Sequence, residues 1–172
     1  MKRLFLLRHA KAERDADSGE DFDRPLAARG RRDAELLGRQ LSAKNWRPDL
    51  IVASTSVRTL ETAALLTAAW PASVSIAKDK DLYLASAARI MSYVRAAPDG
   101  AGSLMIVAHN PGLEEFALKL AGDALRRMQK KFPTCALAVF DLSIDHWARA
   151  SPDFARLIAY FTPKDLADDT LA

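Results

Sequence analysis

Four cationic or imidazole side chains follow short apolar runs of this chain. They are Arg8, His9, Arg58 and His109. A neutral imidazole nitrogen is a competent nucleophile toward phosphorus. A guanidinium group is a planar, permanently charged fork that suits the non-bridging oxygens of a phosphate. The four side chains together indicate a site that holds a phosphoryl group, which His9 attacks while His109 stabilises the transferred charge.

The apolar runs before these side chains have the length and composition of buried β-strands. They cover residues 4–7, 50–53 and 104–108, and a helical pattern follows each of them. Ligands of open α/β sheets bind outside the carboxyl ends of the strands. We therefore expect the two arginines and two histidines to converge on one crevice.

The starts of the following helices supply two further binding candidates. Asn110 is a good N-cap and Pro111 a good first helical residue, so free backbone N–H groups should face the crevice behind His109. Ser54 stands near the start of the other helix, where hydroxyl and amide groups favour an anion. We expect Ser54 and Asn110 to contact the substrate.

The rest of the chain continues the alternation of strands and helices. Further strands are predicted at 72–78, 136–142 and 155–161, helices after residue 30 and at 56–70, 85–97 and 111–122, and loops at 10–24 and 79–83. This order predicts an α/β fold in three layers, with a mostly parallel central sheet and helices on both faces. We expect one domain over residues 1–172, in which about 163–172 form a loose tail.

Length, charge and composition exclude several classes of protein. A chain of 172 residues fits one domain, and its net charge of +3 is too mild for a dedicated nucleic-acid binder. No apolar run is long enough to cross a membrane, and the opening run is too short for a signal peptide, so we expect a cytoplasmic protein. One cysteine and three histidines without paired spacing give no metal site, and we expect no cofactor.

The motifs around these residues resemble the histidine phosphatase superfamily, which has the phosphoglycerate mutase-like fold. The matching segments are Leu6-Leu7-Arg8-His9-Ala10, the run from Ser54 to Ala63, Val107-Ala108-His109-Asn110-Pro111-Gly112, Arg24-Pro25-Leu26 with Arg29-Gly30, and Leu82-Tyr83-Leu84-Ala85. Within the superfamily the chain is most similar to the small SixA-type phosphohistidine phosphatases. The resemblance covers residues 1 to about 122.

The resemblance implies that His9 accepts the phosphoryl group and that Arg8, Arg58 and His109 form its pocket. It also implies a phosphohistidine-bearing partner, such as a phosphotransfer domain of a signalling relay. Two features depart from the pattern. Ala10 stands where the superfamily has glycine, and the Glu that larger relatives use as proton donor has no clear counterpart. Asp81, with Asp79 behind it, is the nearest candidate.

The missing acid favours a substrate whose leaving group needs little help. An alkyl phosphate requires a general acid, whereas a phosphohistidine with a protonated ring leaves as neutral imidazole. About fifty residues separate Arg58 from His109, which leaves no room for a lid domain. We therefore expect a monomeric, metal-independent phosphatase that acts on phosphohistidine in proteins. The alternatives are a phosphatase or mutase for small phosphomonoesters, and a non-catalytic phospho-ligand-binding module.

Two basic clusters lie outside these motifs. The first comprises Arg29, Arg31 and Arg32, and the second Arg126, Arg127, Lys130 and Lys131. Both are interpreted as solvated helix faces. Neither predicts a nucleic-acid site, because aromatic residues for base stacking are not interleaved with the second cluster. If either is functional, a protein partner is preferred.

Overall fold

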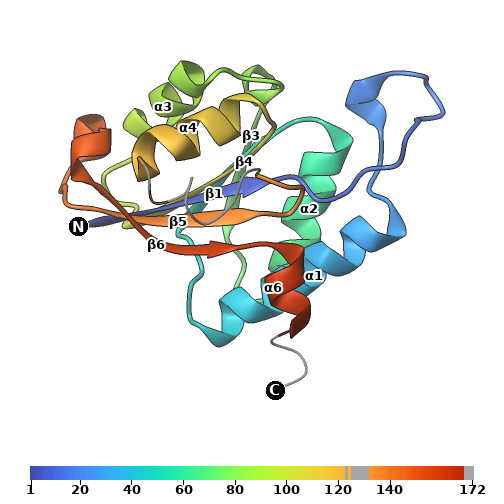
Figure 1. The fold of residues 1–172 in the computed structure, drawn as a ribbon, viewed down its shortest axis with the longest axis horizontal. Helices are drawn as coiled ribbons and strands as arrows, with labels where there is room; N and C mark the ends of the chain where they lie inside the picture. The colour runs from blue at the N-terminus through green and yellow to red at the C-terminus, as the bar shows by residue number, and fades with distance from the viewer. Residues whose placement is uncertain (123, 125–131, 169–172) are drawn as a thin grey trace.

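A six-stranded β-sheet forms the centre of the computed structural model, which describes residues 1–122, 124 and 132–168 (Figure 1). The strands are β1 (Lys2–Arg8), β2 (Leu50–Ser54), β3 (Ser75–Asp79), β4 (Ser103–Ala108), β5 (Leu137–Leu142) and β6 (Ala155–Phe161). Their order is β3-β2-β4-β1-β5-β6. The first four strands in this order are parallel, and β5 and β6 add an antiparallel edge.

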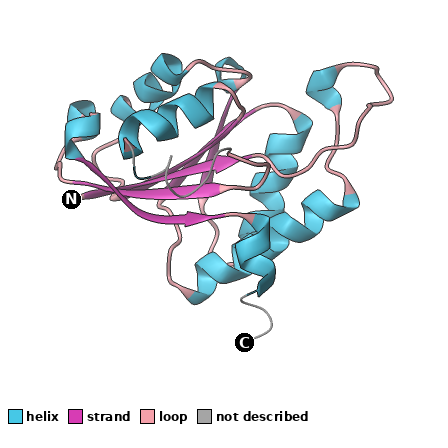
Figure 2. Ribbon diagram, in the orientation of Figure 1, coloured by secondary structure: helices cyan, strands magenta, loops and turns pink. Residues whose placement is uncertain are grey.

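Helices cover both faces of the sheet (Figure 2). They are α1 (Ala28–Ala43), α2 (Val57–Ala68), α3 (Ala87–Arg95), α4 (Gly112–Ala121) and α6 (Pro163–Asp168). Helices α3 and α4 pack on one face, and α1, α2 and α6 lie on the other (Figure 1). The expected three-layer α/β fold with a mostly parallel sheet is confirmed.

Strand β1 shows why its sequence is apolar without alternation. Leu4 and Leu6 point into the core under α3 and α4, and Phe5 and Leu7 point into the core over α1 and α2. A strand that is buried on both faces requires such a continuous apolar run. All four side chains are at most 1% exposed. The end of β1, where Arg8 and His9 lie, is therefore held by packing on both sides.

The end of the chain differs from its prediction as a loose tail. Residues 163–168 form α6, and Leu166 is 1% exposed in the core beside α1. The Asp165 carboxylate accepts hydrogen bonds from the backbone N–H and the hydroxyl of Thr162, at 2.7 and 2.8 Å. Thr162-Pro163-Lys164-Asp165 is thus a capping-box pattern with proline at the first helical position. Residues 169–172 lie outside the described part of the chain.

The other elements lie where they were expected, within a few residues at their ends. Strand β3 begins at Ser75 rather than residue 72, α2 ends at Ala68 rather than residue 70, and α3 spans Ala87–Arg95. Among the described residues, none of the helices combines the length and apolar character that a membrane crossing needs.

Candidate active site

The carboxyl ends of β1, β2 and β4 meet at one edge of the sheet and border a pocket of about 260 Å³. The residues that line it are Arg8, His9, Lys11, Ala12, Asp21, Arg24, Arg58, Leu84, His109, Asn110 and Thr134. The two arginines and two histidines predicted from the sequence are all among them. The convergence follows from parallel strands, whose carboxyl ends share one edge of the sheet.

His9 is held as a neutral ring with one nitrogen free. Its Nδ1 lies 2.8 Å from the carbonyl oxygen of Ala10. A carbonyl can only accept, so Nδ1 carries the proton and the Nε2 lone pair is unprotonated. Burial, together with the positive charges of Arg58 and Arg8, lowers the pKa of His9 to about 4. At neutral pH the ring is therefore uncharged and nucleophilic at Nε2.

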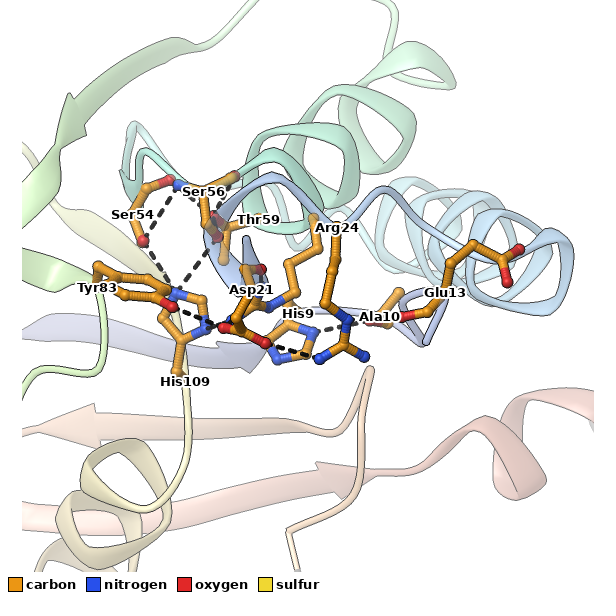
Figure 3. A network of polar contacts seen from close by, with 11 residues as sticks. His9, Ala10, Glu13, Asp21, Arg24, Ser54, Ser56, Thr59, Tyr83 and His109 are labelled. Atoms are coloured by element: carbon orange, nitrogen blue, oxygen red, sulfur yellow. Dashed lines mark hydrogen bonds and ion pairs between the residues drawn. The ribbon is translucent and has the colours of Figure 1, made fainter. Parts of the chain in front are cut away.

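His109 lies next to His9 and is also neutral. The two ring centroids are 5.1 Å apart, and His109 is 1% exposed. Burial lowers its pKa to about 3, with further contributions from His9 and Arg58. Nε2 of His109 lies 2.9 Å from Oγ of Ser54 (Figure 3), and its Nδ1 lies 3.5 Å from Nη2 of Arg58.

Ser54 was expected to contact the substrate, and this prediction needs correction. Its side chain is fully buried behind His109 and does not line the pocket. The hydroxyl bonds the ring of His109, so Ser54 positions that histidine. The reason is the place of Ser54 at the end of β2, inside the sheet, rather than at the exposed start of α2.

The two arginines differ in how they are held. Arg58 is 4% exposed, and its guanidinium donates from Nη2 to the Asp21 carboxylate at 2.8 Å. Nη1 of Arg8 donates to the carbonyl oxygen of Phe132 at 2.9 Å. Nε of Arg8 is buried and has no hydrogen-bond partner among the described residues. A buried donor without a partner is costly, so this N–H is available to an anionic ligand.

Ala10 stands where the superfamily pattern has glycine, and its methyl group does not crowd the pocket. The residue is fully buried in the core under α1 and α2 and is not among the lining residues. Its backbone N–H donates to Oγ1 of Thr62 at 3.0 Å, and that hydroxyl donates to the carbonyl oxygen of Arg58 at 2.6 Å. Thr62 thus connects the start of α2 to the segment that carries His9.

Asn110 lines the pocket but is not the N-cap of the next helix. Helix α4 begins at Gly112, and the peptide bond between Asn110 and Pro111 is cis. A cap requires the side-chain oxygen to accept from the backbone, whereas here the amide nitrogen donates. Its partners are Oε2 of Glu114 at 2.8 Å and the carbonyl oxygen of Phe132 at 3.0 Å. The expected cap is therefore wrong, although the residue borders the crevice.

The predicted proton donor Asp81 lies outside the pocket. Its carboxylate pairs with Arg89 on the surface, and its backbone N–H donates to Asp79 at 2.9 Å. The carboxylate that borders the pocket is Asp21, from the short 3₁₀ helix η1 (Asp21–Asp23). This turn belongs to the segment 10–24, which contains six acidic residues and no periodicity. Asp21 therefore gave no signal of its own in the sequence.

Asp21 is bound by three side chains from different parts of the chain (Figure 3). Tyr83 donates its hydroxyl to Oδ2 at 2.6 Å, Arg58 donates to the same oxygen at 2.8 Å, and Arg24 donates to Oδ1 at 2.7 Å. The hydrogen bond from Tyr83, followed by those from Arg24 and Arg58, holds the pKa of Asp21 well below its usual range. The group is thus a carboxylate anion at neutral pH.

The two basic clusters are not part of this pocket as far as the structure describes them. On α1, Arg31 pairs with Glu61 at 2.9 Å and Arg29 lies 3.6 Å from Asp33. Arg126, Arg127, Lys130 and Lys131 lie outside the described residues.

Comparison with known proteins agrees with this geometry. The model of the histidine phosphatase superfamily (branch 1) matches residues 4–83. An uncharacterized protein of Mycobacterium tuberculosis is 33% identical over 164 residues, which cover 92% of this chain and 100% of that relative. The crystal structure of SixA from Agrobacterium tumefaciens has a TM-score of 0.82 at 32% identity, covering 94% of this chain and 98% of the other.

A protein histidine phosphatase SixA complexed with tungstate shares the fold, with a TM-score of 0.78 at 20% identity over 95% of this chain and 99% of the other. The chain belongs to the histidine phosphatase superfamily and is a phosphatase with the phosphoglycerate mutase-like fold. Within the superfamily it is of the SixA type.

Proposed function

We propose that the chain hydrolyses phosphohistidine on a protein, through a covalent phosphohistidine on His9 and without a metal ion. The observation that carries the proposal is the held tautomer of His9, whose Nδ1 bonds the Ala10 carbonyl and whose Nε2 is free in a pocket with two arginines. A neutral imidazole nitrogen next to fixed positive charges has what a nucleophile for phosphorus needs.

The reaction takes two steps. Nε2 of His9 attacks phosphorus, the phosphorus–nitrogen bond of the substrate breaks, and the substrate ring leaves as neutral imidazole with a proton on its other nitrogen. Water then attacks the phosphoryl group on His9 and releases inorganic phosphate. Arg8, Arg58 and His109 stabilise the charge on the oxygens in both steps. The first step exchanges one nitrogen–phosphorus bond for another, so we expect it to be nearly thermoneutral.

The state of the pocket carboxylate supports phosphohistidine over alkyl phosphates. An alkoxide is a poor leaving group and needs a proton from a general acid. Asp21 is the one carboxylate among the described residues that line the pocket, and its depressed pKa keeps it deprotonated at neutral pH. It cannot serve as that acid. A phosphohistidine brings its own proton on the ring and does not need one from the enzyme.

The form of the site supports a protein substrate. Between α2 and β4 the chain has only β3, the 3₁₀ helix η2 (Lys80–Leu82) and α3, so this stretch contributes no lid domain. An open crevice accepts a side chain that another protein presents. The proposed partner is a phosphohistidine-bearing protein such as a phosphotransfer domain, and the enzyme is proposed to act as a cytoplasmic monomer. The SixA structure with bound tungstate, a tetrahedral oxyanion like phosphate, is consistent with this chemistry.

The first test compares two substrates in the presence of a chelator. They are a phosphotransfer domain phosphorylated on histidine and p-nitrophenyl phosphate, each assayed with the native chain and with His9→Ala. We expect a higher kcat/KM for the phosphohistidine protein, and its loss in His9→Ala by at least about a thousandfold. Equal or better turnover of the aryl phosphate would favour small phosphomonoesters. Tight binding of both without turnover would favour a binding module.

A further inference from the structure

The mouth of the pocket is strongly basic except at one position. Arg8, Arg24, Arg58 and Lys11 all line it, and Asp21 is the one acidic residue among the described lining residues. The Asp21 side chain is 48% exposed, whereas Arg58 beneath it is 4% exposed. Asp21 therefore stands at the entrance, on the solvent side of the phosphate-binding groups, where the leaving part of a substrate would lie.

The position of Asp21 is fixed by contacts that do not involve a substrate. Tyr83 donates to its carboxylate at 2.6 Å, and the Tyr83 ring packs edge-on against Phe22 with centroids 5.0 Å apart. The guanidinium of Arg58 lies 5.7 Å from the centre of the Tyr83 ring. Figure 3 shows Tyr83 and Arg24 reaching the Asp21 carboxylate from opposite sides. The carboxylate is thus held in place before any ligand arrives.

We propose that Asp21 recognises the leaving imidazole of the substrate, because its carboxylate accepts a hydrogen bond from the ring nitrogen that does not carry the phosphoryl group. The inference rests on the proposed function and names the residue that makes the site selective for phosphohistidine. Displacement at phosphorus is in line, so the leaving nitrogen lies opposite Nε2 of His9. That direction leads out of the pocket toward its mouth, where Asp21 stands.

The two imidazoles of the transfer step then have matching surroundings. After the attack, His9 still donates from Nδ1–H to the carbonyl oxygen of Ala10, and these two atoms lie 2.8 Å apart in this structure. The substrate ring keeps its proton on the far nitrogen, which bonds the Asp21 carboxylate. The electron pair of the broken phosphorus–nitrogen bond stays on the leaving nitrogen, and the product is a neutral imidazole. Asp21 neither gives nor takes a proton.

Charge explains why a carboxylate is needed at this position. The substrate ring must carry a positive charge to leave as neutral imidazole, and an imidazole titrates near pH 6.5 when unperturbed. Four basic side chains around the mouth disfavour that cation. A carboxylate in contact with the ring N–H opposes them and favours the protonated ring. An aryl phosphate has no such N–H group and gains nothing from Asp21.

The test replaces Asp21 by asparagine and measures kcat/KM, which reports the transfer step. The probes are a short peptide phosphorylated on histidine with phosphoramidate, and p-nitrophenyl phosphate. For Asp21→Asn we expect kcat/KM of the phosphohistidine peptide to fall about 10- to 100-fold, the effect of losing a hydrogen bond to a charged group. With p-nitrophenyl phosphate we expect a clearly smaller fall, which reflects only the altered contact with Arg58, because this substrate has no ring N–H group to lose.

The pH profile gives a second readout. Asp21 raises the pKa of the bound phosphohistidine ring, and the pH dependence of a step within the enzyme–substrate complex reports such a pKa. The rate of transfer in single turnovers at saturating peptide therefore falls at high pH, and this fall moves to lower pH in Asp21→Asn. The groups facing the carboxylate are Tyr83, Arg24 and Arg58, and the rest of the lining adds Arg8, His9, Lys11 and His109. All of them are present in both proteins, so the difference between the two profiles belongs to Asp21.

Asp23→Asn is the matched control, since Asp23 lies in the same 3₁₀ turn and its carboxylate accepts from Ser18 at 2.8 Å. Asp23→Asn should leave kcat/KM unchanged for both substrates. Asp21→Glu should have a higher kcat/KM for the peptide than Asp21→Asn. A parallel loss on both substrates in Asp21→Asn would overturn the inference, because it would mean that Asp21 merely positions Arg58. A native chain that does not turn over the peptide would instead contradict the proposed function.

Discussion

The two histidines of the pocket are both neutral at pH 7, but they differ in which ring nitrogen is hydrogen-bonded to the protein. His9 bonds the Ala10 carbonyl through Nδ1, so its Nε2 is free to attack. His109 bonds the Ser54 hydroxyl through Nε2, so its Nδ1 remains beside Arg58. The group that bonds each ring, a backbone carbonyl for His9 and a hydroxyl for His109, thus decides which of its nitrogens faces the pocket. The sequence predicted both histidines, but the atoms that orient them became visible only in the folded chain.

Burial of these two rings predicts an acid-sensitive fold. The folded-state pKa values are lowered to about 4 for His9 and about 3 for His109, while the unfolded rings titrate near 6.5. Below pH 6.5 the unfolded chain therefore binds protons that the folded chain does not. The contribution of the two neutral rings to the free energy of unfolding is fully present above about pH 7 and decreases as the pH falls toward 4. At pH 5 the loss is about 2 kcal/mol per ring.

Urea unfolding of the native chain at about pH 7.5 and about pH 5 measures this loss. The double variant His9→Asn/His109→Asn should show a smaller difference between the two pH values, because its rings no longer titrate. Equal unfolding free energies of the native chain at both pH values would contradict the account of two neutral, buried rings.

The start of α4, just after His109, packs against the loop that follows η2 and carries Tyr83. Gly112 lies so close to the loop after η2 that an added Cβ atom would meet the carbonyl oxygen of Ala85 at 1.8 Å. The same loop carries Tyr83, and the residues just before Gly112 carry His109. A side chain at position 112 would therefore separate the loop that holds Asp21 from the strand that holds the second histidine.

Gly112→Ala should consequently reduce both stability and activity. We expect a loss of about 1–3 kcal/mol in the free energy of unfolding, as for an overpacked core site, together with a lower kcat/KM. Gly100→Ala is the control, since an added Cβ there meets nothing within 4 Å. It should change the free energy of unfolding by less than about 0.5 kcal/mol. A Gly112→Ala chain as stable and active as the native one would show that the two loops are not coupled here.

Elements with strong periodic patterns were predictable, and those fixed by tertiary contacts were not. Strands β1, β2 and β4 are continuous apolar runs because helices cover both faces of the sheet, and that signal placed the four pocket residues correctly. The turn at Asp21 has no periodicity, since long-range contacts to Arg58 and Tyr83 hold it. Helix α6 was missed although its capping box was present in the sequence.

At the scale of the whole molecule, the site is defined by chemistry rather than by size. A larger hollow of about 390 Å³ lies at the opposite edge of the sheet, beside the amino ends of β2 and β3, lined by residues such as Arg47, Asp49 and Ser75. The smaller pocket lies at the carboxyl ends, where the two histidines meet. This is the edge at which parallel sheets bind ligands, and the sheet order brings β1, β2 and β4 together there.

The central claim is that His9 carries the phosphoryl group between the two steps, and trapping that group tests it most directly. The native chain is mixed with a phosphohistidine peptide that bears a radiolabelled phosphoryl group, and the reaction is quenched in alkali within the first turnover. We predict a label on His9 that is stable in alkali, labile in acid and absent in His9→Ala. Turnover without a labelled chain, or a label on His109, would contradict the account.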